Sequence, residues 1–333
     1  MEKILTVENL RVQIKTPFGH LKAVRGVSFA LFCGEVLAIV GESGSGKSVT
    51  AKSILRLLPQ RECAITDGKI IFRGQDLLEL SEKEMRKIRG NQIAMVFQDP
   101  MTSLNPTMQI GKQIMEGIIL HRRLPKKEAK KEAIKLLELV GIRDPVRMFS
   151  QYPHELSGGM RQRAVIAMAL GGQPDILILD EPTTALDVSV QAQILDLLKQ
   201  LKQKLGTSFI LITHDLGVVS RLADRVLVMY AGKIVEIGTV EDIFYDARHP
   251  YTWALFDCVP RINEKKRLAS IPGSPPHLIA EPKGDAFAPR NPYALNIDFK
   301  KEPPLIKISG THYARTWLLD ERAPKIIRKA EKE

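Results

Sequence analysis

The most constraining feature of this chain is the loop GESGSGKS at residues 41–48, which lies between an apolar run (residues 36–40) and a helical pattern (residues 49–58). The loop fits G-x-x-x-x-G-K-[ST], in which glycine-rich backbone wraps its N–H groups around phosphate oxygens at a helix N-terminus. In this arrangement Lys47 contacts the β- and γ-phosphates of a nucleotide and Ser48 ligates Mg²⁺. The alternative is a flexible glycine/serine turn. The residues expected to bind nucleotide here are Gly41, Ser43, Gly44, Ser45, Gly46, Lys47, Ser48 and Val49.

Four short apolar runs predict the architecture around this loop. They cover residues 36–40, 93–97, 176–179 and 209–212. Such runs, separated by helical patterns, are typical of a parallel sheet that is buried on both faces in an α/β fold. An apolar stripe predicts a helix over residues 187–205. A shorter amphipathic helix is expected over residues 126–140, followed by Gly141 as its C-terminal stop.

The distribution of proline divides the chain at about residue 240. Nine of the 20 prolines lie in residues 1–240 and eleven in the last 93 residues. In that last part they interrupt every helical or strand pattern. We therefore expect one domain over residues 1–240 and a loop-rich C-terminal extension over residues 241–333.

Composition limits the cellular compartment and the classes of binding partner that we expect for this protein. The 3 cysteines are far apart, which excludes a disulfide framework and favours a reducing compartment. We find neither a signal-peptide core nor an apolar run near the ~20 residues of a membrane span, so we expect a cytosolic or membrane-surface protein. The net charge of +11 fits nucleic acid, an anionic membrane, a phosphate-rich ligand or a solvated basic surface. Charge alone does not choose among these.

Two carboxylates, Asp180 and Glu181, follow the apolar run at residues 176–179. A buried parallel strand delivers its C-terminal residues to the ligand crevice of an α/β sheet. Asp180 suits a Mg²⁺ shell because hard cations take oxygen ligands, and Glu181 is placed to accept a proton from an attacking water. Alone, such a pair is more often a strand meeting solvent. Together with the phosphate loop it indicates hydrolysis of a nucleoside triphosphate.

A further phosphate-directed feature is LSGGM at residues 156–160, which precedes a helical pattern that continues through Leu170. Ser157 can cap this helix, and Gly158 and Gly159 allow the backbone to approach an anion closely. One interpretation is a helix N-terminus aimed at phosphate. The other is an ordinary capped helix.

These motifs, in this order, resemble the Walker A, signature and Walker B motifs of ATP-binding-cassette (ABC) ATPases. Three further residues match the family pattern. Gln98 in VFQDP resembles the Q-loop glutamine, Asp187 in ALD the D-loop aspartate, and His214 in LITHD the switch histidine. Each match is weak alone, but chance agreement of all of them in the correct order is negligible.

The resemblance implies a P-loop NTPase fold of the ABC type, with an antiparallel β subdomain and a helical subdomain inserted at about residues 99–160. It implies two cassettes that face each other head to tail, each covering ATP bound to the other. Glu181 would activate water, His214 would hold the γ-phosphate and position that base, and Gln98 would link the γ-phosphate and Mg²⁺ to the permease-facing segment. The implied Mg²⁺ ligands are Ser48, Gln98 and Asp180, and the residues supplied across the dimer are Ser157, Gly158, Gly159 and Asp187.

The resemblance narrows to the oligopeptide/dipeptide importer subfamily, over essentially the whole chain. It is carried by FQDPMTSLNP at residues 97–106, DVSVQAQ at 187–193, HPYT at 249–252 and Met160 where glutamine is usual. Val49 after Ser48 is closer to the D-type ATPase subunit than to its F-type partner.

This subfamily implies a set of partners and a location. The partners would be a second ABC ATPase subunit (in a hetero- or homodimer), two transmembrane permeases and an extracytoplasmic solute-binding protein, with no nucleic acid. The chain would sit at the cytoplasmic face of the membrane and drive uptake of oligopeptides or dipeptides, with oligosaccharides and nickel complexes as related solutes. The alternative is a non-transport ABC ATPase that acts on nucleic acid or ribosomes.

Two positions depart from the family pattern. Ile14 stands where the family stacks an aromatic ring on adenine, and Phe18 or His20 are the nearest possible substitutes. We expect weaker discrimination of adenine but retained nucleotide binding, because an aliphatic contact lacks the ring–ring contribution of about 0.5–1.5 kcal/mol. In the extension, the four cysteine positions of relatives with an iron–sulfur cluster hold Asp285, Asn291, Asp298 and Thr316. None offers thiolate or imidazole, so we predict no cluster.

Overall fold

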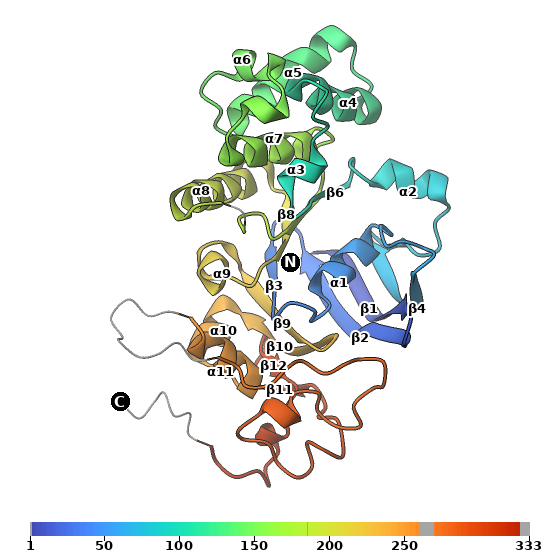
Figure 1. The fold of residues 1–333 in the computed structure, drawn as a ribbon, viewed down its shortest axis with the longest axis vertical. Helices are drawn as coiled ribbons and strands as arrows, with labels where there is room; N and C mark the ends of the chain where they lie inside the picture. The colour runs from blue at the N-terminus through green and yellow to red at the C-terminus, as the bar shows by residue number, and fades with distance from the viewer. Residues whose placement is uncertain (1, 185, 260–269, 327–333) are drawn as a thin grey trace.

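The computed structural model describes residues 2–326, except residue 185 and residues 260–269. Its strands form two sheets (Figure 1). An eight-stranded sheet has the order β11-β12-β10-β9-β3-β8-β7-β6, and a four-stranded antiparallel sheet has the order β2-β1-β4-β5. The strands are β1 (Lys3–Thr16), β2 (Gly19–Phe32), β3 (Val36–Val40), β4 (Cys63–Phe72), β5 (Gln75–Asp76), β6 (Ile93–Val96), β7 (Ile176–Asp180), β8 (Ser208–Ile212), β9 (Arg225–Tyr230), β10 (Lys233–Thr239), β11 (Ile306–Lys307) and β12 (Tyr313–Ala314).

The predicted parallel sheet is confirmed. Strands β9, β3, β8, β7 and β6 pair in parallel, and every residue of β3, β7 and β8 is buried. Continuous apolar runs suit these strands because helices and the second sheet exclude water from both faces. The carboxyl ends of β3 and β7 lead into the phosphate loop and into Glu181. These two parallel strands lie on either side of β8, so the sheet delivers both motifs to the same edge.

Helices pack on this sheet and form a separate group at one end of the molecule. Figure 1 shows α4, α5 and α6 gathered there, with the extension at the opposite end. The helices are α1 (Lys47–Ile54), α2 (Glu82–Ile88), α3 (Pro100–Ser103), α4 (Ile110–Arg122), α5 (Lys126–Leu139), α6 (Pro145–Ser150), α7 (Gly158–Leu170), α8 (Val188–Leu205), α9 (Leu216–Leu222), α10 (Val240–Tyr245) and α11 (Pro250–Asp257). Within the described residues, no helix is both long and apolar enough to cross a membrane.

The helix predicted at residues 187–205 is confirmed as α8, which Asp187 caps by accepting the Val190 N–H at 3.0 Å. The helix expected at 126–140 is α5. The helix expected at residues 49–58 is present as α1, but with other bounds. It begins at Lys47 and ends at Ile54, because Arg56 takes a left-handed conformation with φ of 50° and turns the chain.

The extension joins the eight-stranded sheet. Its hairpin strand β12 pairs antiparallel with β10 and thereby extends the sheet beyond the cassette's own strands. Tyr230 of β9 packs its ring against Tyr251 and Phe287 of the extension, with centroids 4.6 and 5.2 Å away. The predicted boundary after residue 240 falls just inside the start of α10, and a common apolar core lies across it.

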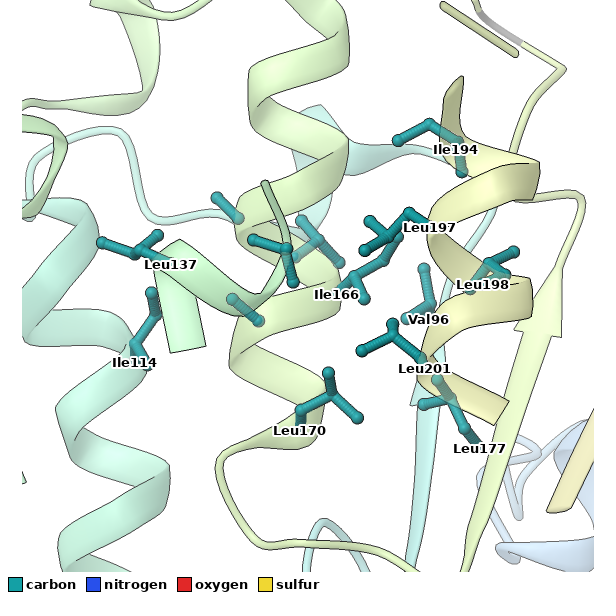
Figure 2. Close-up of a cluster of buried hydrophobic side chains, with 14 of the residues drawn as sticks. Val96, Ile114, Leu137, Ile166, Leu170, Leu177, Ile194, Leu197, Leu198 and Leu201 are labelled. Atoms are coloured by element: carbon teal, nitrogen blue, oxygen red, sulfur yellow. The ribbon is translucent and has the colours of Figure 1, made fainter. Parts of the chain in front are cut away.

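Among the described residues, the largest apolar core lies between one face of the eight-stranded sheet, α7, α8 and the helical group (Figure 2). Leu198 is fully buried there, whereas Leu205 at the end of the same helix is 46% exposed. We expect Leu198→Ala to lower the free energy of unfolding by about 2–5 kcal/mol, because it removes buried methyl groups and leaves a cavity. Leu205→Ala is the matched control and should change it by about 1 kcal/mol or less. Urea unfolding of both variants measures the difference, and equal losses would contradict this placement.

Candidate active site

The phosphate loop connects β3 to α1 and depends on glycine at its tight points. Gly41 has φ of 148°, and a Cβ there would lie 2.2 Å from the Met229 carbonyl oxygen. Gly46 has φ of 100°, and a Cβ there would lie 2.6 Å from the Ala23 carbonyl oxygen. Both backbone positions therefore exclude other side chains. The loop closes over the N-terminus of α1, where free N–H groups and the helix dipole favour an anion.

Lys47 points its ammonium group into this loop. Its Nζ donates to the carbonyl oxygens of Gly41 and Glu42, at 2.7 and 2.8 Å. The side chain is buried, and burial lowers the pKa of Lys47, while the nearby carboxylates of Glu181 and Asp180 act in the opposite direction. Two backbone carbonyls thus hold the ammonium in the loop. An anionic phosphate can replace them as its hydrogen-bond partner.

Ser48 and Asp180 meet beside the loop. The Ser48 hydroxyl donates to Oδ1 of Asp180 at 2.9 Å, although the two residues are 132 positions apart. Asp180 is buried at the end of β7, and this burial raises its pKa. A hydroxyl and a carboxylate are oxygen ligands of the kind that a hard cation takes. The fold thus brings together two of the residues that the sequence offered as Mg²⁺ ligands.

Glu181 is the centre of a hydrogen-bonded group that contains all three expected catalytic residues. The Gln98 amide donates to Oε2 of Glu181 at 3.0 Å, and Nδ1 of His214 lies 3.2 Å from Oε1. The backbone N–H of Glu181 donates to the Ile212 carbonyl at 2.9 Å, which ties this residue to the end of β8. The carboxylate is therefore fixed from both sides at the edge of the sheet.

Thr184 is a member of this group that the sequence did not indicate. Its hydroxyl donates to Oε2 of Glu181 at 3.0 Å, the same oxygen that accepts from Gln98. A threonine three residues after the Walker B carboxylates was the available signal, but the local pattern does not say where its hydroxyl points. The structure also places the Gln98 amide on Glu181, whereas the sequence had offered Gln98 as a Mg²⁺ ligand.

A cavity of about 870 Å³ joins these groups. The phosphate loop, Gln98, Glu181 and His214 line one part of it. Ile14, Leu21 and Ala23 of the β1–β2 hairpin line another part of it. Phe18 is 84% exposed at the hairpin tip, and neither it nor His20 is among the described lining residues. The extension contributes Pro275, Pro276, His277 and Leu278.

The remaining expected nucleotide contacts are not brought to this cavity. Ser157 caps α7 by accepting the Met160 N–H at 3.4 Å, and Asp187 caps α8. A Cβ on Gly159 would lie 2.6 Å from a Val190 methyl group, so close packing of α7 on α8 requires glycine there. None of Ser157, Gly158, Gly159 and Asp187 is among the described residues that line the cavity. Within one chain these residues serve as helix caps and packing contacts.

The four positions at which the family resemblance led us to look for cysteines organise local turns. Asp285, Asn291 and Thr316 accept the N–H of the residue two positions on, at 3.0, 2.9 and 3.2 Å, and Asp298 accepts the Leu295 N–H at 2.6 Å. Burial raises the pKa of Asp285 to about 6. Across the part of the chain that the structure describes, no group of three or more His, Cys, Asp or Glu residues could hold a metal ion.

Comparisons with known proteins show the family of this chain. Residues 24–184 match the ABC transporter family, and residues 235–297 match the oligopeptide/dipeptide transporter C-terminal region. The chain is 58% identical to the oligopeptide transport ATP-binding protein OppD of Bacillus subtilis, over 97% of this chain and 91% of the relative. It is 56% identical to the dipeptide transport ATP-binding protein DppD of Lactococcus lactis, over 98% and 93%.

Solved structures that resemble this chain also come from ABC proteins. A dimeric ABC cassette, MJ0796, bound to ADP and Pi is 28% identical, with a TM-score of 0.64 over 71% of this chain and 98% of that chain. CbiO1 of Clostridium perfringens, part of the ABC transporter complex CbiONQ, is 30% identical, with a TM-score of 0.62 over 74% and 92%. This chain is therefore an ABC-type ATPase and belongs to the oligopeptide/dipeptide transporter branch of the ABC transporter family.

Proposed function

We propose that this chain is the ATP-hydrolysing subunit of an importer that takes up oligopeptides, dipeptides or related solutes such as oligosaccharides or nickel complexes. The observation that carries the proposal is the Gln98–Glu181–His214 group, which lies on the same cavity as the phosphate loop. The match of the extension to the oligopeptide/dipeptide transporter C-terminal region supports the class of solute. The names of the bacterial relatives support it too.

Binding of ATP would use groups that the fold already holds in place. The backbone N–H groups of the phosphate loop and the Lys47 ammonium would contact the β- and γ-phosphates. Ser48 and Asp180 are the residues that would hold Mg²⁺, and their 2.9 Å contact fits a shared cation. When bound, Mg²⁺ neutralises charge on the phosphate oxygens. Lys47 would leave its two carbonyl partners for phosphate, which is a stronger, charge-assisted interaction.

Hydrolysis needs a base that is close to water and correctly oriented. Glu181 would take the proton from the attacking water, and the donors Gln98 and Thr184 would hold its Oε2 so that Oε1 can face that water. His214 would contact the γ-phosphate and fix the orientation of the base. Most of the rate enhancement would then come from positioning and from electrostatic stabilisation of a loose phosphoryl transition state.

The site is proposed to be completed by a second ATPase subunit, in a homodimer or a heterodimer. Ser157 caps α7 and Gly158 and Gly159 are its first residues, and none of the three is among the described residues that line the cavity of their own chain. In a head-to-tail dimer they would cover ATP held by the partner, and Asp187 would lie at the same interface. ATP would favour the closed dimer because its phosphates contact both halves only in that state.

The complete importer would also contain two transmembrane permeases and an extracytoplasmic solute-binding protein, with this chain peripheral at the cytoplasmic face of the membrane. The experiment is to measure its ATPase rate with permease-containing liposomes, binding protein and peptide, and separately with DNA, RNA or ribosomes. Stimulation by permeases and peptide is expected. Stimulation by nucleic acid or ribosomes alone would favour the alternative of a non-transport ABC ATPase.

The protein is predicted to be purified without an iron–sulfur cluster. The side-chain oxygens of Asp285, Asn291, Asp298 and Thr316 each accept a backbone N–H, and oxygen is a poor substitute for thiolate on cluster iron. Iron and acid-labile sulfide assays on protein prepared without oxygen measure this directly. Stoichiometric iron and sulfide would overturn the prediction.

A further inference from the structure

The extension reaches into the nucleotide cavity, although it follows the cassette in the sequence. Residues 275–278 line the same cavity as the phosphate loop, with Ile14 and Leu21 on the hairpin. The catalytic group of Gln98, Glu181 and His214 surrounds the place where the γ-phosphate would lie. Because the phosphates of ATP lie along the loop, the base would lie away from the catalytic group, on the side lined by Ile14 and the extension.

Backbone and core contacts hold this segment against the hairpin. The Lys22 N–H donates to the Leu278 carbonyl at 2.9 Å. The Leu278 side chain is buried and belongs to the same core as Tyr230, Tyr251 and Phe287. His277 is exposed and is among the residues that line the cavity, while its buried neighbour Leu278 anchors the chain. Residues 275–278 therefore form an anchored part of the cavity wall, in which His277 has an exposed side chain.

A second anchor connects the extension to the phosphate loop itself. Arg290 donates to both carboxylate oxygens of Glu42, at 2.7 and 3.0 Å, and its Nε donates to the Pro272 carbonyl at 2.8 Å. The hydroxyl of Tyr251 accepts the Glu42 N–H at 2.7 Å. One arginine thus bridges the loop that would hold the phosphates and the chain that leads to Pro275. Planar bidentate pairing of this kind fixes geometry as well as charge.

Residues 275–278 offer a planar ring to the cavity, which Ile14 does not. The branched aliphatic side chain of Ile14 cannot stack on a purine as a ring does. The imidazole of His277 is planar, and the neighbouring rings of Pro275 and Pro276 are apolar. We propose that the C-terminal extension supplies the base-binding wall of the ATP site, with His277 as the side chain that contacts the adenine base. This inference rests on the proposed binding of ATP at the phosphate loop.

The test compares two ligands on the purified full-length protein by titration calorimetry, namely ATP and inorganic tripolyphosphate, which has the phosphates but no base. His277→Ala should weaken ATP binding about fivefold or more, the lower range of base–ring stacking effects, and leave tripolyphosphate binding unchanged. His277→Phe should restore ATP affinity because it keeps a planar ring. His20→Ala is the matched control, an exposed histidine outside the cavity lining, and should change neither ligand.

Each other outcome has a definite meaning. Unchanged ATP affinity in His277→Ala would overturn the inference, and so would equal weakening of both ligands, because the histidine would then act on the phosphates. Failure of the wild-type protein to bind either ligand would instead overturn ATP binding at this loop. Retained folding of His277→Ala is expected because its side chain is exposed, and circular dichroism checks it.

Discussion

Replacing Glu181 with glutamine is expected to reduce ATP turnover by about 10²–10⁴-fold while ATP binding is retained. Glutamine has nearly the shape of glutamate and still offers Gln98 or Thr184 an acceptor oxygen, but it cannot take a proton from water. Binding without hydrolysis should therefore hold the closed state, and the variant should accumulate as an ATP-bound dimer. Single-turnover hydrolysis assays and size-exclusion chromatography with ATP measure the two effects.

Glu79→Gln is the matched control for that experiment, because Glu79 is exposed and lies outside the lining of the cavity. It should hydrolyse ATP at the wild-type rate. If Glu181→Gln also did so, the base would be another group, and the hydrogen bonds from Gln98 and His214 would have to be explained as structural. A variant that neither binds ATP nor hydrolyses it would contradict the role of Glu181 as a base alone.

The second large effect is expected from Lys47→Ala. This substitution removes a buried ammonium that donates to the carbonyl oxygens of Gly41 and Glu42 and that would contact phosphate when ATP binds. Loss of one preorganised donor at developing charge typically costs about 10²–10³-fold in rate, and ATP affinity should fall as well because the same group binds the ground state.

Steady-state hydrolysis and ATP titration separate these two contributions. Lys69→Ala, which removes an exposed lysine from β4, is the control and should behave as wild type. Because the Lys47 side chain is buried, its loss also leaves space in the loop, and thermal unfolding without nucleotide reports that cost. Normal ATP affinity and rate in Lys47→Ala would contradict the assignment of this loop as the phosphate site.

Local sequence was sufficient to predict the parts whose structure depends on local pattern. The apolar runs of β3, β7 and β8 specify buried strands because successive side chains point to opposite faces, so both faces of each strand are apolar. Helix α8 follows from its apolar stripe and its Asp187 cap. The end of α1 was missed because the left-handed turn at Arg56 does not alter the hydrophobic period before it.

The candidate site, too, contains residues that the sequence predicts and contacts that it does not. The glycine spacing and Lys47 identify the phosphate loop, and the order of the motifs identifies Asp180, Glu181 and His214. The donation of Gln98 and Thr184 to one oxygen of Glu181 was not predictable, because it depends on how the chain between Gln98 and β7 folds. Sequence order also gave no sign that Asp285 and its three counterparts cap turns.

By itself, the sequence determined that this protein has a phosphate loop at the end of a parallel strand, because the glycine and lysine spacing suits one backbone path. Only the tertiary structure decided that residues 275–278 form a wall of the same cavity. That contact joins residues more than 200 positions apart, through the Glu42–Arg290 pair and the Lys22–Leu278 hydrogen bond. No periodicity records it, since proline-rich loops acquire their course from the surfaces on which they pack.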